Sequence, residues 1–108
     1  MTSDPKALIT QIRSMVDARN WNQFHTPENL AKSVSIEAAE LLECFQWGNE
    51  PDLAEVKREL ADVLTYCLLL ADKLELDPDS IVLEKLEETK GKYPVDKSFG
   101  KSDKYDRL

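Results

Sequence analysis

Hydrophobic residues in this chain recur every three or four positions within four segments, which polar breaks separate. Residues three and four apart lie on one face of an α-helix, so the pattern predicts four amphipathic helices. They are expected over about residues 4–19, from 27 to a break at 48–51, over about 51–74 and from 78 to about 90. No segment alternates between apolar and polar residues as a half-buried strand does. The expected fold class is therefore all-α.

Capping residues support these helix boundaries. A side-chain oxygen just before a helix accepts a hydrogen bond from the first turn, and proline fits the first helical position. The expected caps are Ser3 or Asp4 for the first helix, Thr26 for the second and Asp77 for the fourth. Gly91 is expected to stop the fourth helix, because glycine is common just after a helix ends.

The third expected helix is apolar almost all round from Val63 to Ala71. A helix of that kind is covered on several sides in a folded protein. One small domain of 108 residues has little material of its own to cover it. We therefore expect a four-helix fold whose bundle is completed by homo-oligomerisation, as a homodimer or a homotetramer.

The end of the chain differs in composition from the rest. After Pro94 it is polar and lysine-rich, with too few apolar residues to pack on its own. We expect a helical domain over residues 1–94, followed by a C-terminal tail over 95–108. This tail is expected to be mobile or to become ordered only on binding.

Charge and cysteine content limit the binding partners and the cellular compartment to be expected for this protein. The formal net charge of −7 and the pI near 4.7 argue against binding to nucleic acid, which needs a basic surface. No apolar run is long enough to span a membrane, and no signal peptide is recognised. Cys44 and Cys67 match neither a disulfide scaffold nor a thiolate metal site. We expect a cytoplasmic protein without a nucleic-acid or membrane partner.

Two pairs of acidic residues carry the candidate chemistry. Glu37 and Glu40 on the second helix, like Glu59 and Asp62 on the third, stand three residues apart and share a helix face. If the two helices pack antiparallel, the pairs can face each other, and four adjacent negative charges repel unless a cation lies among them. Oxygen ligands favour Mg2+ or Mn2+, and Mg2+ held by carboxylates usually serves a phosphate-bearing substrate. The spacing therefore predicts such a metal site.

The segments around these residues resemble a known family. SIEAAEL at 35–41 and ELADV at 59–63 resemble the ExxE and ExxD motifs of the MazG-type all-α nucleoside triphosphate pyrophosphohydrolases. Similar to segments of the dCTP pyrophosphatase branch are NWNQFHTP at 20–27, FQW at 45–47 and KYP at 92–94. The resemblance covers about residues 5–95. It implies Mg2+-dependent hydrolysis of a nucleoside triphosphate, such as dCTP or a modified dCTP, to the monophosphate and pyrophosphate, in a nucleotide-pool house-cleaning role.

The same resemblance implies roles for individual residues. Catalysis and metal binding would belong to Glu37, Glu40, Glu59 and Asp62, with Mg2+ as the cofactor and Mn2+ as a substitute. Base stacking would belong to Trp21, Trp47 and Tyr66, and phosphate binding to Lys85 and Lys92. Aromatic rings suit the first role because their faces grip a flat base. Thr89 stands where the family has an asparagine and Ile12 where it has a pocket histidine, so the choice of base stays open.

Other interpretations of the same residues also stay open. A non-catalytic helical dimerisation or regulatory module could retain this fold, and it would not be stabilised by a divalent metal. Trp21 and Trp47 could be core or interface anchors, and Tyr66 could be buried packing. A di-iron carboxylate bundle is set aside, because it needs Glu-x-x-His pairs and the single histidine, His25, lies outside the expected helices.

Overall fold

The structure is a computed structural model that describes residues 5–48 and 50–108. Its elements are α1 (Pro5–Ala18), the 3₁₀ helix η1 (Trp21–Phe24), α2 (Pro27–Glu43), α3 (Leu53–Lys73), α4 (Pro78–Lys92), the short α5 (Val95–Ser98) and the 3₁₀ helix η2 (Tyr105–Arg107). Within the described ranges there is no strand, so the expected all-α class is confirmed. None of the described helices is long and apolar enough to cross a membrane.

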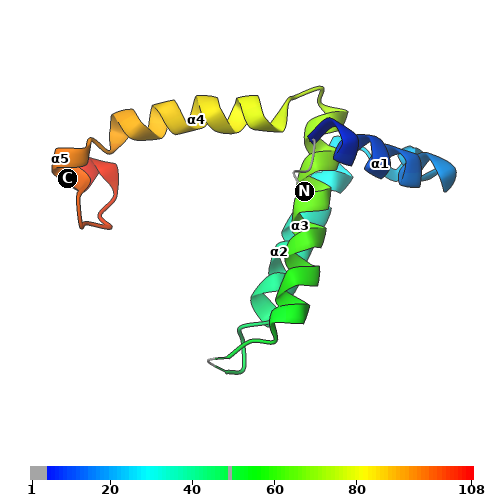
Figure 1. The fold of residues 1–108 in the computed structure, drawn as a ribbon, viewed down its shortest axis with the longest axis horizontal. Helices are drawn as coiled ribbons and strands as arrows, with labels where there is room; N and C mark the ends of the chain where they lie inside the picture. The colour runs from blue at the N-terminus through cyan, green and yellow to red at the C-terminus, as the bar shows by residue number, and fades with distance from the viewer. Residues whose placement is uncertain (1–4, 49) are drawn as a thin grey trace. The chain divides into compact units, whose positions relative to one another are not determined.

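The chain forms two compact units, Met1–Leu76 and Asp77–Leu108. In the first unit, α2 and α3 lie side by side and run in opposite directions, joined by the connection around residues 44–52 (Figure 1). Helix α1 contacts α3 as well. The antiparallel pair is the arrangement that the acidic spacing requires, and it positions the candidate site.

A small apolar core joins the three helices of the first unit. Ile12 and Val16 from α1 pack with Leu30 from α2 and Leu69 from α3. Val16 and Leu30 are 1% exposed, so the core is densest where the beginning of α2 meets the second half of α3. Tyr66 packs against this core from α3. The acidic segments lie towards the other end of the α2–α3 pair.

The expected caps of two helices are confirmed. The Thr26 hydroxyl accepts a hydrogen bond from the Asn29 amide at 3.2 Å, and the Asp77 carboxylate accepts one from the Ser80 amide at 2.9 Å. Helix α3 begins at Leu53, because Asp52 caps it. Ser3 and Asp4, the expected caps of the first helix, lie outside the described residues.

The end of α3 agrees with expectation, whereas α4 ends later than expected. After α3, Glu75 adopts a left-handed conformation with φ of 57°, and the Leu76 amide donates to the Ala71 carbonyl at 2.8 Å. This is the usual helix-ending turn, made without glycine. Gly91 was expected to end α4, and that was wrong, since the helix continues to Lys92. Pro94 disfavours the helical conformation at the residue before it and so sets the end.

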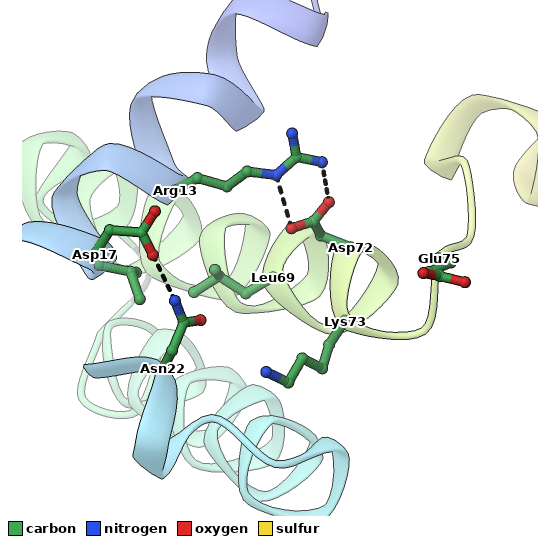
Figure 2. Close-up of a pocket in the computed structure, with 8 residues that line it drawn as sticks. Arg13, Asp17, Asn22, Leu69, Asp72, Lys73 and Glu75 are labelled. Carbon is green, nitrogen blue, oxygen red and sulfur yellow. Dashed lines mark hydrogen bonds and ion pairs between the residues drawn. The ribbon is translucent and has the colours of Figure 1, made fainter. Parts of the chain in front are cut away.

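A bidentate ion pair ties α1 to α3. The Arg13 guanidinium binds both Asp72 carboxylate oxygens, with Nε 2.9 Å from Oδ2 and Nη2 against Oδ1 (Figure 2). Hydrogen bonding to Arg13 lowers the pKa of Asp72 below its ordinary value. The pair borders a pocket of about 310 Å³, on whose other side Asn22 donates to Asp17. The charges of this pocket are paired across elements, which indicates a structural role in holding α1.

In the second unit, residues 95–108 contain the short helix α5 and the 3₁₀ helix η2, and the expectation that this tail is mobile or becomes ordered only on binding stays a prediction. Helix α5 follows Pro94, and the Ser98 hydroxyl donates to the Pro94 carbonyl at 2.7 Å. The Tyr105 amide then donates to the Tyr93 hydroxyl at 3.2 Å. Tyr93, at the end of α4, thus supplies a hydrogen-bond acceptor for the backbone of the tail. The expected domain boundary at residue 94 stays a prediction.

Candidate functional site

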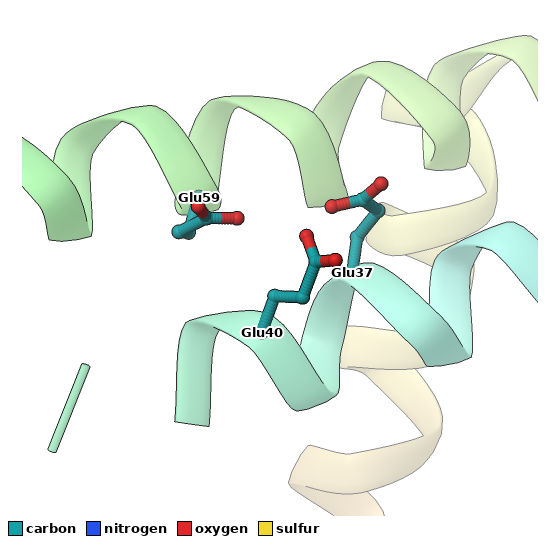
Figure 3. A group of neighbouring side chains, drawn as sticks. All are labelled: Glu37, Glu40 and Glu59. Carbon is teal, nitrogen blue, oxygen red and sulfur yellow. The ribbon is translucent and has the colours of Figure 1, made fainter. Parts of the chain in front are cut away.

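Three glutamates meet between α2 and α3. One carboxylate oxygen from each of Glu37, Glu40 and Glu59 lies within 4.8 Å of the others (Figure 3). Glu37 and Glu40 stand one turn apart on α2, and Glu59 reaches them from α3. We call these residues the carboxylate trio. Oxygen ligands at this separation can hold a hard divalent cation.

Two oxygens of the carboxylate trio are buried without a partner. Glu37 Oε2 and Glu59 Oε2 are inaccessible to solvent, and neither has a hydrogen-bond partner among the described residues. Removing a charged oxygen from water without a compensating partner is costly. A bound cation or a proton would stabilise these two oxygens. Carboxylates on an ordinary solvated helix surface do not need such a partner, because water solvates them.

The protonation of the carboxylate trio reflects this crowding. The pKa of Glu40 is raised above its ordinary value, chiefly by a hydrogen bond shared with the Glu37 carboxyl and by the Glu37 charge. The pKa of Glu59 is raised mainly by burial and then by the Glu40 charge. Both shifts have the sign expected when like charges share a poorly solvated site. A cation bound among these groups would offset the repulsion that raises the pKa of Glu40 and of Glu59.

Asp62 stands apart from the carboxylate trio. It lies on α3 three residues after Glu59, is exposed, and does not join the group of oxygens within 4.8 Å. Its charge nevertheless contributes to the raised pKa of Glu59. The structure thus brings together three of the four carboxylates named from the sequence, and a ligand role for Asp62 stays a prediction.

A pocket of about 460 Å³ adjoins the carboxylate trio. Its lining residues come from the end of α2 and the first half of α3: Glu40, Glu43, Cys44, Glu55, Arg58 and Glu59. Arg58 brings a positive charge to this lining, and that charge acts to lower the pKa of Glu59. Sequence reasoning missed Arg58. The available signal was its place three residues after Glu55 and beside Glu59, on the acidic face of α3.

The three aromatic residues named for base stacking lie in different surroundings. Trp21, in η1, is 43% exposed and has the Arg19 guanidinium 5.8 Å from its ring centre. Trp47 follows α2 and is 88% exposed. Tyr66 is partly buried against the apolar core. The structure does not gather these rings into one described pocket, and base stacking stays a prediction for all three.

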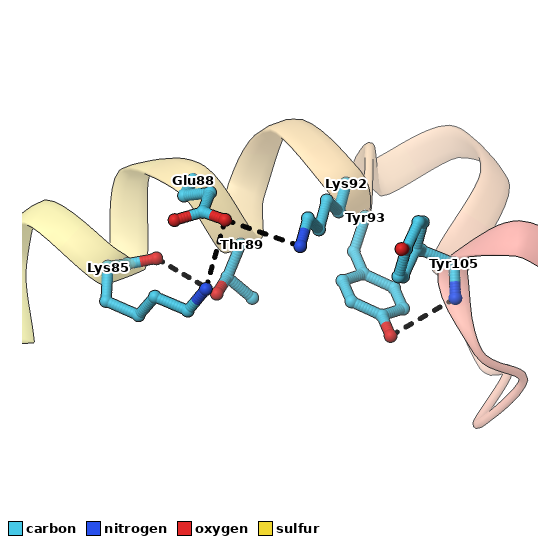
Figure 4. Close-up of polar contacts among 6 residues, drawn as sticks. All are labelled: Lys85, Glu88, Thr89, Lys92, Tyr93 and Tyr105. Atoms are coloured by element: carbon cyan, nitrogen blue, oxygen red, sulfur yellow. Dashed lines mark hydrogen bonds and ion pairs between the residues drawn. The ribbon is translucent and has the colours of Figure 1, made fainter.

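The two lysines named for phosphate binding belong to the second unit. Lys85 and Lys92 both lie on α4 and both form ion pairs with Glu88, at 3.0 Å and 3.3 Å (Figure 4). We call these three residues the lysine–glutamate group. Its members are exposed to partly exposed, and each charge has an opposite charge beside it.

Fold and site together define a class: a small all-α protein with a candidate divalent-cation centre between two antiparallel helices. Residues 32–108 match the model of the MazG-like family. The chain belongs to the MazG-like family, as its acidic motifs led us to expect.

Similar proteins include dCTP pyrophosphatase 1 from Mus musculus, 35% identical over 100 residues, and from Homo sapiens, 36% identical over 100 residues. These matches cover 83% of this chain but 59% of each relative, so the chain spans little more than half the length of these curated relatives. A crystal structure of a pyrophosphatase from Archaeoglobus fulgidus is also similar, with 42% identity and a TM-score of 0.79. That match covers 87% of this chain and 95% of the archaeal one.

Proposed function

We propose that this protein is a Mg2+-dependent nucleoside triphosphate pyrophosphohydrolase, which converts its substrate to a nucleoside monophosphate and pyrophosphate. The observation that carries this proposal is the carboxylate trio, with two buried oxygens that lack partners in the described structure. Similarity to dCTP pyrophosphatases and to an archaeal pyrophosphatase supports the reaction class.

The residues present fit a hard divalent cation. All donors of the carboxylate trio are oxygens, and Glu37 and Glu59 each have one oxygen whose burial is otherwise uncompensated. The trio, with Asp62 beside it on α3, would hold Mg2+, or Mn2+ as a substitute. When bound, the cation would neutralise the phosphate chain and make a bound water more acidic.

The chain's own residues would supply the positioning of the water. A carboxylate oxygen not taken up by the cation can orient a water molecule or accept its proton. Glu37 and Glu40 are the two candidates, because they stand one turn apart on α2 and their carboxylates lie close together. Hydrolysis between the α and β phosphates would follow from in-line attack by that water.

Base recognition would come from Trp21, Trp47 and Tyr66. An indole or phenol face stacks on a flat base, and polar groups at the base edge choose among bases. Two of the three rings are at least 43% exposed, so they have surface to offer a ligand. Similarity to dCTP pyrophosphatases favours a deoxycytidine nucleotide as the substrate, with Lys85 and Lys92 binding phosphate oxygens.

We also propose that the protein is a homo-oligomer, as a dimer or a tetramer. Large apolar side chains of α2 and α3 are highly exposed: Ile36 at 59%, Leu42 at 70%, Leu53 at 78% and Leu64 at 54%. So much apolar surface on one helix pair is typical of an interface. Sedimentation equilibrium at several concentrations tests this, and a monomer at every concentration would contradict it.

The experiment that tests the function is product analysis of the purified protein with a panel of natural and modified NTPs and dNTPs. Reactions with Mg2+, with Mn2+ and with a chelator are compared. Metal-dependent release of pyrophosphate and monophosphate is expected, and the rate ranking identifies the base. If the panel yields no product with either metal, and Mg2+ does not raise the melting temperature, a non-catalytic helical module becomes the better interpretation.

A further inference from the structure

The Lys92 side chain is held from two sides within the second unit. Its ammonium lies 3.3 Å from Glu88 Oε1 and 4.8 Å from the centre of the Tyr105 ring (Figure 4). The Lys92 side chain is 39% exposed, compared with 64% for Lys85 and 70% for Lys90 on the same helix. Among these three lysines of α4, Lys92 is the most enclosed.

Glu88 sets the spacing of two ammonium groups. The same oxygen, Oε1, receives Lys85 at 3.0 Å and Lys92 at 3.3 Å, one from each direction along α4. These hydrogen bonds lower the pKa of Glu88, so the carboxylate stays charged. Two cations around one anion leave one net positive charge, which can attract a further anion.

Tyr105 is itself fixed in place by the end of α4. Its amide donates to the Tyr93 hydroxyl at 3.2 Å, and the two rings meet edge to face with centres 6.2 Å apart and planes at 82°. The Ser98 hydroxyl also approaches the Tyr93 carbonyl at 3.2 Å. We call residues 95–108 the C-terminal clasp, because they bring the ring of Tyr105 back over the side chain of Lys92.

An ammonium group has three donor directions. At Lys92 one points to Glu88 and the ring of Tyr105 covers another side, which leaves capacity for a further acceptor. A free lysine loses much rotamer entropy when a ligand orders it, and a side chain held in advance loses less. The clasp therefore prepares Lys92 for an anion.

We propose that Tyr105 is a positioning residue, which holds the Lys92 ammonium ready for phosphate oxygens. This inference rests on the proposed function for its substrate class. It assigns to the C-terminal clasp a role in phosphate binding, exerted through Lys92. The Tyr105 ring supplies the effect, because the face of an aromatic ring attracts a cation.

A pair of variants isolates the ring. Tyr105→Leu removes the aromatic face, whereas Tyr105→Phe keeps it. With the triphosphate that the panel ranks first, Tyr105→Leu is expected to raise KM about threefold, within the scale of the ordering cost of one long side chain, and to leave kcat unchanged. Tyr105→Phe is expected to retain the wild-type KM. Equal KM values for wild type, Tyr105→Leu and Tyr105→Phe would overturn the inference.

A double-mutant cycle tests whether Tyr105 acts through Lys92. Lys92→Met removes the charge and keeps a chain of similar length. In that background Tyr105→Leu is expected to have no further effect on KM, because the ammonium on which the ring acts is gone. A full threefold effect in the absence of the charge would show that Tyr105 acts by another route, and would overturn the inference.

A readout independent of turnover separates this inference from the proposed function. The ε-methylene protons of Lys92 should show an upfield ring-current shift by NMR in wild type and Tyr105→Phe, but not in Tyr105→Leu. Titration with inorganic pyrophosphate and Mg2+ should move the Lys92 resonances, with a Kd about threefold higher in Tyr105→Leu, since its Lys92 is no longer held in advance.

The two failures are distinguishable. If no triphosphate is hydrolysed but pyrophosphate moves the Lys92 resonances with the expected difference in Kd, the proposed function is wrong and the role of Tyr105 in phosphate binding stands. If triphosphates are hydrolysed but pyrophosphate leaves Lys92 unmoved, the inference is wrong and the function stands.

Discussion

The carboxylate trio and the lysine–glutamate group both contain charged residues three or four positions apart on a helix. Like charges meet in the trio, whereas opposite charges pair in the lysine–glutamate group. In the trio, like charges meet between two helices, and two oxygens are buried without a partner in the described residues. In the lysine–glutamate group, opposite charges meet on the surface of one helix. The pKa of Glu40 is raised by its like-charged neighbour, whereas the pKa of Glu88 is lowered by hydrogen bonds from two lysines.

This electrostatic difference indicates which of the two groups needs a ligand. Exposed pairs of opposite charge satisfy themselves, and each contributes little to stability. Like charges in a poorly solvated place are retained at a cost to the folded protein, and such strain concentrates at functional sites. The carboxylate trio is thus a candidate centre in its own right, whereas the lysine–glutamate group needs the C-terminal clasp to become more than a surface ion pair.

The largest effect should come from removing one charge of the carboxylate trio. Glu40→Gln is expected to lower the rate of triphosphate hydrolysis by on the order of 100-fold or more, because a lost metal ligand costs at least as much as a lost outer partner. Glu28→Gln, the same change in the first turn of α2, is the matched control and should retain activity. Steady-state rates and circular dichroism measure activity and folding.

Asp62→Asn extends this comparison to the carboxylate outside the trio. We expect a loss of similar size, since Asp62 shares the acidic face of α3 and its charge reaches Glu59. If both Glu40→Gln and Asp62→Asn kept wild-type rates, the metal assignment would be wrong. If only Asp62→Asn kept its rate, the centre would consist of the trio alone.

A smaller effect is expected at Trp47, which belongs to the first unit but carries no charge. Trp47→Ala removes an indole that is 88% exposed, so the fold should be little affected. Loss of a stacking surface is expected to raise KM about tenfold, the scale of one base–aromatic stack. Metal affinity, measured by Mn2+ titration, should stay unchanged. A variant with weaker metal affinity and normal KM would make Trp47 a structural residue.

The starts of α2 and α4 could be predicted from the sequence, because helix capping follows local rules. Thr26 and Asp77 cap their helices as expected. Two i, i+3 pairs each share one helix face, so antiparallel packing of the two helices can bring them near each other, as it does for Glu37, Glu40 and Glu59. The exclusion of Asp62 from the trio could not be predicted, since it depends on a side chain one methylene shorter and on the rotation of α3.

The C-terminal clasp could not be predicted for a different reason. It depends on a contact between the rings of Tyr93 and Tyr105, which stand twelve positions apart in the sequence. Such a contact does not appear in the spacing of hydrophobic and polar residues. Composition alone described residues 95–108 as polar and lysine-rich, which is correct but uninformative about one aromatic pair. The end of α4 was difficult to predict because Gly91 and Pro94, two residues that commonly end helices, stand close together. The helix continues past Gly91 to Lys92 and ends before Pro94.

The dependence of stability on pH should separate the trio from paired charges. A carboxyl whose pKa is higher in the folded protein binds its proton more tightly there, so its contribution is present below its ordinary value of 4.5 and lost as pH rises. In chelator, the melting temperature of wild type should therefore fall relative to Glu40→Gln as pH rises above 4.5. Asp72, with its pKa lowered by Arg13, contributes in the opposite direction in both proteins. Parallel curves for wild type and Glu40→Gln would contradict the crowding of the trio.

The smallest effect is expected where opposite charges pair on the surface. Lys90 and Glu87 form an ion pair at 3.1 Å on α4, with side chains 70% and 76% exposed. Water solvates both groups when the pair is broken, so Glu87→Gln should shift the melting temperature by less than about 2 °C and leave KM unchanged. Differential scanning calorimetry measures the first, and the triphosphate assay the second. A loss of activity in Glu87→Gln comparable to that of Glu40→Gln would mean that burial and like charge do not distinguish the functional carboxylates of this protein.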